Sequence, residues 1–357
     1  MMKLERMHVW LTGVLAMLPV LASAAPSYYT YSPASGKYSA AFGLNNEGRY
    51  AINNNAPEVG YGTASISGMP EGVPSLGGKD TQIRAINNKS EAVGISATAD
   101  GAAHAFLYSS GHTQDLTQAY GLNSVSAIND RGDIAGQTAD SRAFVFRNGH
   151  VDVIGPQTST ADAINNSGDV LVNYYSQGQP NRTAIYSKGS LSDLPRFGNA
   201  YATGVALNDA DWVAGYFTEG GSPSHAFLYD GAAIMELAPA ATSSTAYDIN
   251  IFGDVVGTMD GRAFLFTDGK LIDLNTLIDP KADLLLTSGI AINDHEQILA
   301  KSCDRAGVFC YNTMLLNPVP AVPEPSTAVM LLSGLGVSYG WILRRRWRAS
   351  GKVKAVT

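Results

Sequence analysis

The sequence is poor in the residues that most catalytic and metal-binding sites use. It has two cysteines and six histidines among 357 residues, and only 15% of its residues are charged. Two thiols without further ligands nearby do not make a structural zinc site. HExxH, CxxC, the serine nucleophile elbow and the phosphate-binding glycine loop are all missing from the sequence. We therefore predict a protein that is not an enzyme and that carries no metal and no cofactor.

Basic residues are scarce outside the two ends of the chain. The segment 25–325 holds 16 of the 24 Lys and Arg residues and 30 of the 31 Asp and Glu residues, which gives it a net charge of −14. Such a segment repels a phosphate backbone, so the charge excludes a nucleic-acid role.

The N-terminal residues have the three parts of a secretory signal peptide. Lys3 and Arg6 precede an apolar run from Val9 to Val20, and the small residues Ala22-Ser23-Ala24 follow it. The run is too short to span a bilayer. We expect signal peptidase to remove residues 1–24, so that the mature chain begins near Ala25.

The C-terminal residues predict a membrane anchor. A proline-rich linker, 318–327, precedes an uncharged run, 328–343, and a basic tail, 344–357, that opens with Arg344, Arg345 and Arg346. At about 1.5 Å per residue a helix over this run spans roughly 24 Å, and snorkelling arginines can complete a bilayer crossing. The basic cluster is expected to stay in the cytoplasm and to stop transfer through the inner membrane.

Cys303 and Cys310 are predicted to form one disulfide. An exported chain meets an oxidising compartment, where two close cysteines pair. A turn at Ala306-Gly307 would place them opposite each other in a hairpin.

An internal repeat predicts the fold. An apolar residue followed by asparagine recurs with spacings of 42, 42, 36, 43, 42 and 43 residues, and its asparagines are Asn45, Asn87, Asn129, Asn165, Asn208, Asn250 and Asn293. Each unit then shows a polar turn, an apolar strand that ends near a glycine, an aromatic strand and a last short strand. Four short strands per unit predict an all-β propeller of about seven four-stranded blades over residues 25–317. The segment from Tyr28 to Ala41 resembles an extra half unit that closes the ring, which leaves six or eight blades as alternatives; an open solenoid is the second choice.

The repeated polar residues are predicted to be structural. His104 and His225 begin the aromatic strand in two units, but the matching positions hold Arg142, Arg262 and Thr183, which cannot share one catalytic role. Asparagine side chains bond to backbone N–H groups two residues on, so the seven asparagines suit a repeated turn. The pairs Asp130/Asp133, Asp209/Asp211 and Asp294/Glu296 place carboxylates in the same turns, but Ser90 and Gly253 interrupt that pattern and no turn has the ligand density of a calcium loop.

Two resemblances extend these predictions. The array over 42–316 resembles the HAF family of bacterial extracellular repeats, named after the His-Ala-Phe found here at 104–106 and 225–227. Its departures are Thr183-Ala184-Ile185, Gly307-Val308-Phe309 and a poorly matched first unit. The tail resembles the PEP-CTERM sorting domain, through Pro323-Glu324-Pro325, the apolar run and the arginine cluster. That resemblance implies recognition of the Pro-Glu-Pro triplet by exosortase, a membrane protease of Gram-negative bacteria that make extracellular polysaccharide.

We therefore expect an exported surface or matrix protein of biofilm type, anchored in the inner membrane before processing, with polysaccharide or other matrix components as candidate ligands. The alternative is a secreted carbohydrate-active enzyme, a glycosidase or lyase, on a propeller scaffold. An enzyme would break the repeat symmetry at one place, with acidic or histidine side chains facing the central channel.

Overall fold

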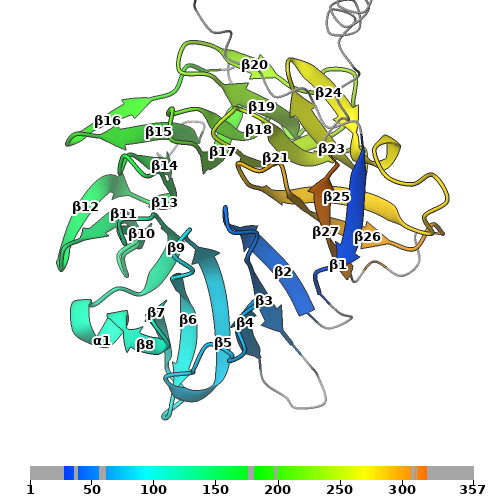
Figure 1. Cartoon of the computed structure of the whole chain (residues 1–357). Helices are drawn as coiled ribbons and strands as arrows, with labels where there is room; N and C mark the ends of the chain where they lie inside the picture. Colours follow the sequence, from blue (N-terminus) through cyan, green and yellow to red (C-terminus); the bar gives the residue numbers. More distant parts are fainter. Residues whose placement is uncertain are drawn as a thin grey trace, which may run out of the picture.

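The computed structural model describes residues 28–319 apart from 36–38, 56–61, 176–180, 197, 199, 307–309 and 311. Seven antiparallel sheets surround a central channel, as Figure 1 shows. The predicted all-β, seven-bladed propeller is confirmed. The signal peptide, the linker from residue 320, the predicted transmembrane helix and the basic tail lie outside the described residues. No helix within the described part of the chain is long and apolar enough to cross a membrane.

The first three blades contain the N-terminal half of the ring. The first has β2 (Ser39–Leu44), β3 (Tyr50–Asn54) and β4 (Thr63–Ile66); the second has β5 (Gly77–Ile86), β6 (Ala92–Thr98), β7 (Ala103–Ser109) and β8 (His112–Asp115); the third has β9 (Ser124–Ile128), β10 (Ile134–Gln137), β11 (Arg142–Arg147) and β12 (His150–Gln157). A helical turn, α1 (Leu116–Tyr120), connects the second blade to the third. In the first blade a single bridge between Ala64 and Val73 stands where the other blades have a fourth strand.

The next three blades are regular. The fourth has β13 (Ser159–Ile164), β14 (Val170–Tyr174), β15 (Arg182–Ser187) and β16 (Ser190–Asp193); the fifth has β17 (Tyr201–Leu207), β18 (Val213–Thr218), β19 (His225–Tyr229) and β20 (Ile234–Glu236); the sixth has β21 (Ser244–Ile249), β22 (Val255–Met259), β23 (Arg262–Thr267) and β24 (Lys270–Asp273), followed by the short helix η1 (Leu274–Thr276).

The seventh blade joins the two ends of the ring. Its inner strands are β25 (Leu285–Ile292), β26 (Ile298–Cys303) and β27 (Asn312–Pro318), and its outermost strand is β1 (Tyr29–Pro33). Strand β1 pairs antiparallel with β27, with Tyr29 opposite Pro318. The predicted half unit at the N-terminus therefore closes the ring, although only part of it, β1, does so; β2 begins the first blade.

The hydrophobic core lies between neighbouring blades. Phe106, Phe144, Phe227 and Phe264, from the aromatic strands, are fully buried, and each packs with residues of the preceding blade. Burying one phenylalanine is worth roughly 1.5–3 kcal/mol. The repeat thus supplies a buried phenylalanine to four of the seven contacts between neighbouring blades.

The recurring glycine of the second strand lies within the strand, not at its end as the sequence suggested. A Cβ atom at Gly94, Gly136, Gly215 or Gly257 would come within 2.0–2.2 Å of a carbonyl oxygen on the innermost strand. The innermost strand bulges at this level, which brings its backbone too close for a side chain.

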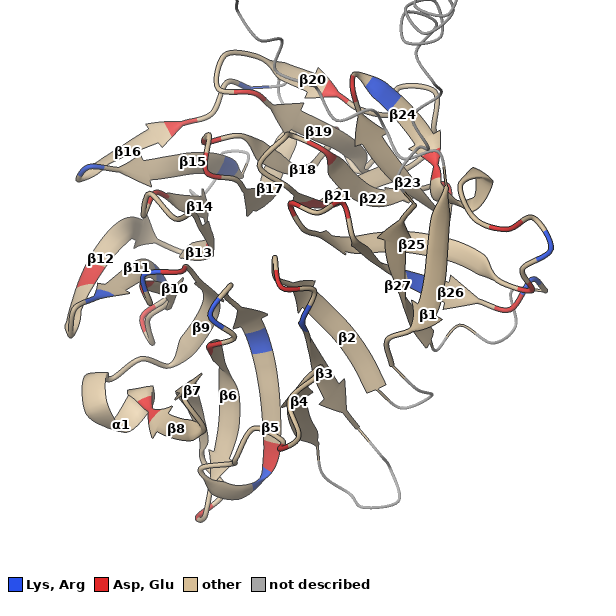
Figure 2. Cartoon of the chain, in the orientation of Figure 1, with Lys and Arg blue, Asp and Glu red and all other residues tan. Residues whose placement is uncertain are grey.

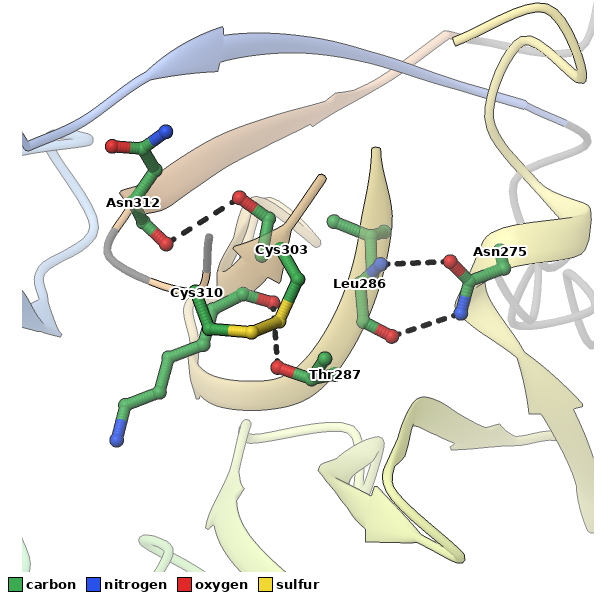
Figure 3. Close-up of a disulfide and its surroundings, with 8 residues drawn as sticks. Asn275, Leu286, Thr287, Cys303, Cys310 and Asn312 are labelled. Atoms are coloured by element: carbon green, nitrogen blue, oxygen red, sulfur yellow. Dashed lines mark hydrogen bonds between the residues drawn. A yellow bond between two sulfur atoms is a disulfide. The ribbon is translucent and has the colours of Figure 1, made fainter. Parts of the chain in front are cut away.

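A disulfide joins Cys303, at the end of β26, to Cys310, before β27. Figure 3 shows the disulfide near Asn312. The Ser302 hydroxyl donates to the Asn312 carbonyl and links the same two strands. Cys303 is buried and Cys310 is exposed. The bridge closes the connection between two strands of the blade that also joins the chain ends.

Candidate functional site

The seven repeated asparagines form a closed ring of hydrogen bonds around one end of the channel. Each lies just after the innermost strand of its blade, and its Nδ2 donates to the backbone carbonyl of the asparagine in the next blade. The N···O distances run from 2.9 to 3.5 Å, and the seventh bond, from Asn293 to Asn45, joins the last blade to the first. All seven side chains are buried.

The same side chains also fix the turn that follows them. In six blades the Oδ1 atom accepts from the backbone N–H groups two and four residues on; Asn45, for example, accepts from Glu47 at 3.1 Å and from Arg49 at 2.8 Å. In the fourth blade, Asn165 accepts from Asp169 at 2.8 Å. The predicted turn role is confirmed, but the bond between blades was not predicted, because spacing along the chain does not reveal which backbone lies beside each turn.

A second, outer ring forms one residue further on. At this position the backbone N–H donates to a side-chain oxygen of the equivalent residue in the next blade, as from Asn88 to Asp130 at 2.8 Å. The described residues make six such bonds, of 2.7–3.0 Å. The missing one would run from Asp209 to Ile251, whose side chain has no acceptor. Isoleucine therefore opens the outer ring at the sixth blade.

The two rings line a cavity of about 190 Å³, the channel mouth, which residues from all seven blades surround. Its rim consists of the seven turns 45–49, 87–91, 129–133, 165–169, 208–212, 250–254 and 293–297, which hold ten acidic and three basic side chains. Figure 2 shows acidic segments among the turns around the channel. The Oδ1 atoms of the outer ring each accept one bond and so keep a free lone pair, whereas six of the inner-ring Oδ1 atoms already accept two. The mouth therefore suits a ligand that is rich in hydrogen-bond donors and is not anionic.

One carboxylate breaks the symmetry of the channel wall. Asp248 stands two residues before Asn250, where the other six units have Ala or Gly. Its Oδ1 accepts from the Ile249 N–H at 2.9 Å and its Oδ2 from the Ile292 N–H of the neighbouring innermost strand at 2.8 Å. Burial raises the pKa of Asp248 to about 7, and the two hydrogen bonds, which lower this pKa, offset only part of the rise. Sequence reasoning missed this residue, although its departure from Ala or Gly was the available signal.

The predicted structural role of the two histidines agrees with their contacts. His104 lies 2.7 Å from Asp115 and His225 lies 2.9 Å from Glu236, in both cases on the adjacent outer strand. Arg182–Asp193 and Arg262–Asp273 form the same pair in the fourth and sixth blades. The strand register makes Ala184 equivalent to Phe106, since each lies opposite the acidic partner. Arg182, and not Thr183, is therefore the counterpart of His104, which corrects the sequence alignment by one residue.

The carboxylate pairs in the turns are engaged in the rings. Asp130 and Asp209 accept from the preceding blade through both carboxylate oxygens, and burial, followed by the nearby Asp169, raises the pKa of Asp211. The described residues contain no group of three His, Cys, Asp or Glu side chains arranged for a metal ion.

A second cavity lies at the fifth blade, away from the mouth. It measures about 390 Å³ and is lined by Gly198, Phe217, Glu219, Ser222, His225 and Glu236. Its polar side chains include the His225–Glu236 pair, and the Phe217 and His225 rings stack at 5.5 Å. Equivalent pairs occur in the second, fourth and sixth blades. The His225–Glu236 pair therefore does not mark this cavity as a binding site, and the mouth is the stronger candidate.

The remaining predicted site residues, Pro323, Glu324, Pro325, Arg344, Arg345 and Arg346, lie outside the described residues. Comparison with protein families matches residues 321–346 to the PEP-CTERM protein-sorting motif. This motif implies an exported surface protein that is processed by exosortase. A search of curated protein sequences finds no significant match.

Solved structures confirm the propeller. The chain is similar to the β-propeller domain of the Trilobed protease from Pyrococcus furiosus, with a TM-score of 0.54 and 11% identity over 84% of this chain and 100% of that one. It is similar to YCF48 bound to D1 peptide, with a TM-score of 0.53 and 11% identity over 85% and 99%. An acylaminoacyl peptidase from Pyrococcus horikoshii gives 0.50 and 11% over 85% and 54%. At this identity the likeness concerns the fold alone.

Proposed function

We propose that this chain is a non-enzymatic protein of the cell surface or extracellular matrix that exosortase sorts and that binds polysaccharide at the channel mouth. The observation that carries the binding role is the mouth itself: a recess that residues of all seven units line and in which six of them present an amide or carboxylate oxygen of the outer ring. Hydroxyl groups of a sugar chain are the donors that such oxygens accept from. The HAF resemblance and the sorting motif support an extracellular place for this binding.

The charge of the protein narrows the class of polysaccharide. The exported segment has a net charge of −14, and the rim of the mouth has three times as many acidic as basic side chains. Like charges repel at an interface. The ligand is therefore a neutral or amino-substituted polysaccharide, and an acidic polysaccharide is disfavoured.

The enzyme alternative has one observation in its favour. Asp248 has a pKa near neutrality, which is where a general acid works. However, both of its oxygens hold backbone N–H groups of the channel wall, and glycosidases use a pair of carboxylates on either side of the scissile bond. The other ring positions are nearly equivalent in all seven units, and a binding role accounts for this symmetry better than catalysis does.

The test is a binding screen with the processed protein against neutral, amino-substituted and acidic polysaccharides. Ala210, exposed in the rim of the mouth, and Ala102, exposed in a turn on the opposite face, offer a matched pair. Ala210→Arg should weaken binding about tenfold by placing a bulky side chain at the rim, a loss of about 1.4 kcal/mol, whereas Ala102→Arg should not change it. Failure to bind any polysaccharide would refute the binding role. Release of sugars that disappears in Asp248→Asn would favour the enzyme.

A further inference from the structure

The chain leaves the propeller on the face that carries the channel mouth. Asn293 of the inner ring donates to the Gln297 Oε1 at 2.9 Å, and the Gln297 Nε2 donates to the Asn317 Oδ1 at 2.7 Å. Asn317 is the second-last residue of β27, and the Val319 N–H beyond it donates to the Tyr28 carbonyl at 2.9 Å. One side-chain relay thus connects the ring to the point where the C-terminal segment begins.

The same face carries an exposed apolar pair in the adjacent blade. Ile251 is 47% exposed and Phe252 is 61% exposed, in the turn directly after Asn250. The other six units have at least one charged or amide side chain at these two positions, and none has two large apolar ones. Ile251 also removes one bond of the outer ring. Two large apolar side chains that lie exposed next to each other, where every other unit has at least one polar side chain, form a candidate interaction surface.

The distance between the propeller and the predicted anchor is short. Eight residues, 320–327, separate Val319 from the apolar run, and even fully extended they reach at most roughly 28 Å. Strand β27, with seven residues, itself rises roughly 23 Å from the opposite face to the mouth face. If the opposite face lay against the bilayer, residues 320–327 would have to run back along the whole side of the seventh blade. That path would take up nearly all of their length.

We infer that the uncut precursor holds its mouth face against the periplasmic surface of the inner membrane, with Ile251 and Phe252 in the lipid interface, and that cutting the tail uncovers the mouth. This inference rests on the anchor and the mouth of the proposed function. Aromatic and aliphatic side chains at the tip of a turn are suited to the interface. The acidic rim opposes lasting adhesion to anionic lipid, so the contact persists only while the tail holds the propeller in place. Matrix polysaccharide then reaches the mouth after sorting and not before.

The experiment measures the accessibility of the two faces in the anchored full-length chain. Both native cysteines are in the disulfide, so Ala210→Cys on the mouth face and Ala102→Cys on the opposite face each introduce the one free thiol. The chains are expressed in a Gram-negative host without exosortase, where the tail stays attached. Spheroplasts are treated with a bulky maleimide-polyethylene glycol, and the same two variants in a chain that stops at Pro325 serve as the released form.

The mouth-face thiol should react about tenfold more slowly than the opposite-face thiol in the anchored chain, since tethering keeps the contact mostly formed. The two should react equally in the released form, and Ile251→Asn combined with Phe252→Asn should speed the reaction at Ala210→Cys in the anchored chain. Equal rates in the anchored chain would overturn the inference. If the mouth-face thiol is protected only when exosortase is added, the contact is with the protease and not with the membrane, which would also overturn the inference. A chain that does not sediment with membranes would instead refute the anchor in the proposed function.

Discussion

Ile251 occupies the one ring position where the side chain cannot accept a hydrogen bond. Ile251→Asn should restore the bond from the Asp209 N–H and complete the outer ring. Because Ile251 is half exposed, little buried apolar area is lost, and we expect the free energy of unfolding to rise by about 1 kcal/mol. Urea denaturation measures it. Phe252→Asn, one residue further and outside the ring, is the control; an equal effect of both variants would contradict the ring explanation.

Asp248 should make the stability depend on pH. Its pKa is about 7 in the folded protein, above the value of 3.8 expected when it is exposed. The folded state therefore binds this proton more tightly than the unfolded state does. Its contribution is fully present below about pH 4 and is lost as the pH rises to about 7, with a slope of at most about 1.4 kcal/mol per pH unit.

Asp248→Ala gives the residue that five of the other six units have two positions before the ring asparagine, and it should flatten this dependence. Urea denaturation of both proteins at pH 5 and pH 8 measures the difference. We expect the wild-type protein to lose more stability between these two conditions than the variant. Parallel losses would show that Asp248 does not titrate in this range.

Residue types that recur in every unit were interpreted correctly from the sequence, and single departures were not. The ring asparagines were placed in turns because their local bonds depend only on neighbouring residues. The cross-strand pairs of His104 and Arg182 with carboxylates depend on the strand register, which the sequence alignment missed by one residue in the fourth unit. Asp248 was missed because nothing in the sequence shows that it reaches the next blade.

Strand β1 closes the ring, and its two tyrosines should differ in importance. Tyr29 is fully buried against the core between the sixth and seventh blades, whereas Tyr31 is 37% exposed. Tyr29→Ala should cost about 3–5 kcal/mol because it leaves a large cavity, and Tyr31→Ala in the same strand should cost much less. Thermal unfolding and protease resistance measure both. Similar losses from the two variants would mean that closure does not depend on the packing of Tyr29.

Tyr29→Phe separates packing from polarity in the same position. The described residues offer no hydrogen-bond partner to the Tyr29 hydroxyl. The conservative variant should therefore keep or slightly raise the stability, which would show that the loss in Tyr29→Ala comes from the cavity.

The order of the strands was predictable because they are short and bounded by turn residues, although the first blade has three strands and a bridge where four strands were expected. The partner of β1 was predictable only in outline: it pairs with β27, more than 280 residues away along the chain, and loop closure over such a distance leaves no local signal. The place of Gly94 and its counterparts inside a strand depends on a bulge in the neighbouring strand, which is equally invisible in a single unit.

At the scale of the whole molecule, the exit point of the chain depends on which strand of the last blade the chain ends with. Seven similar units predict a symmetric object with two faces. Strand β27 is antiparallel to β26, which is antiparallel to β25, so β27 runs toward the mouth face like the innermost strand and the tail leaves from that face. Because the tail and the mouth share one face, removal of the tail during sorting can change the access of polysaccharide to the mouth.

Sorting itself gives the last prediction. Glu324 stands between Pro323 and Pro325, five residues beyond the last described residue of the propeller. Prolines disfavour helical backbone, and an extended segment can bind a protease groove without unfolding the propeller. In a strain that has exosortase, Glu324→Ala should leave folding and export intact and should block cutting, so that the full-length chain stays in the inner membrane. Pro320→Ala, in the same linker but outside the triplet, is the control and should be processed normally. Mass spectrometry of the C-terminus of the mature protein decides the matter, because a wild-type protein that still ends at Thr357 would show that residues 328–343 are a permanent anchor.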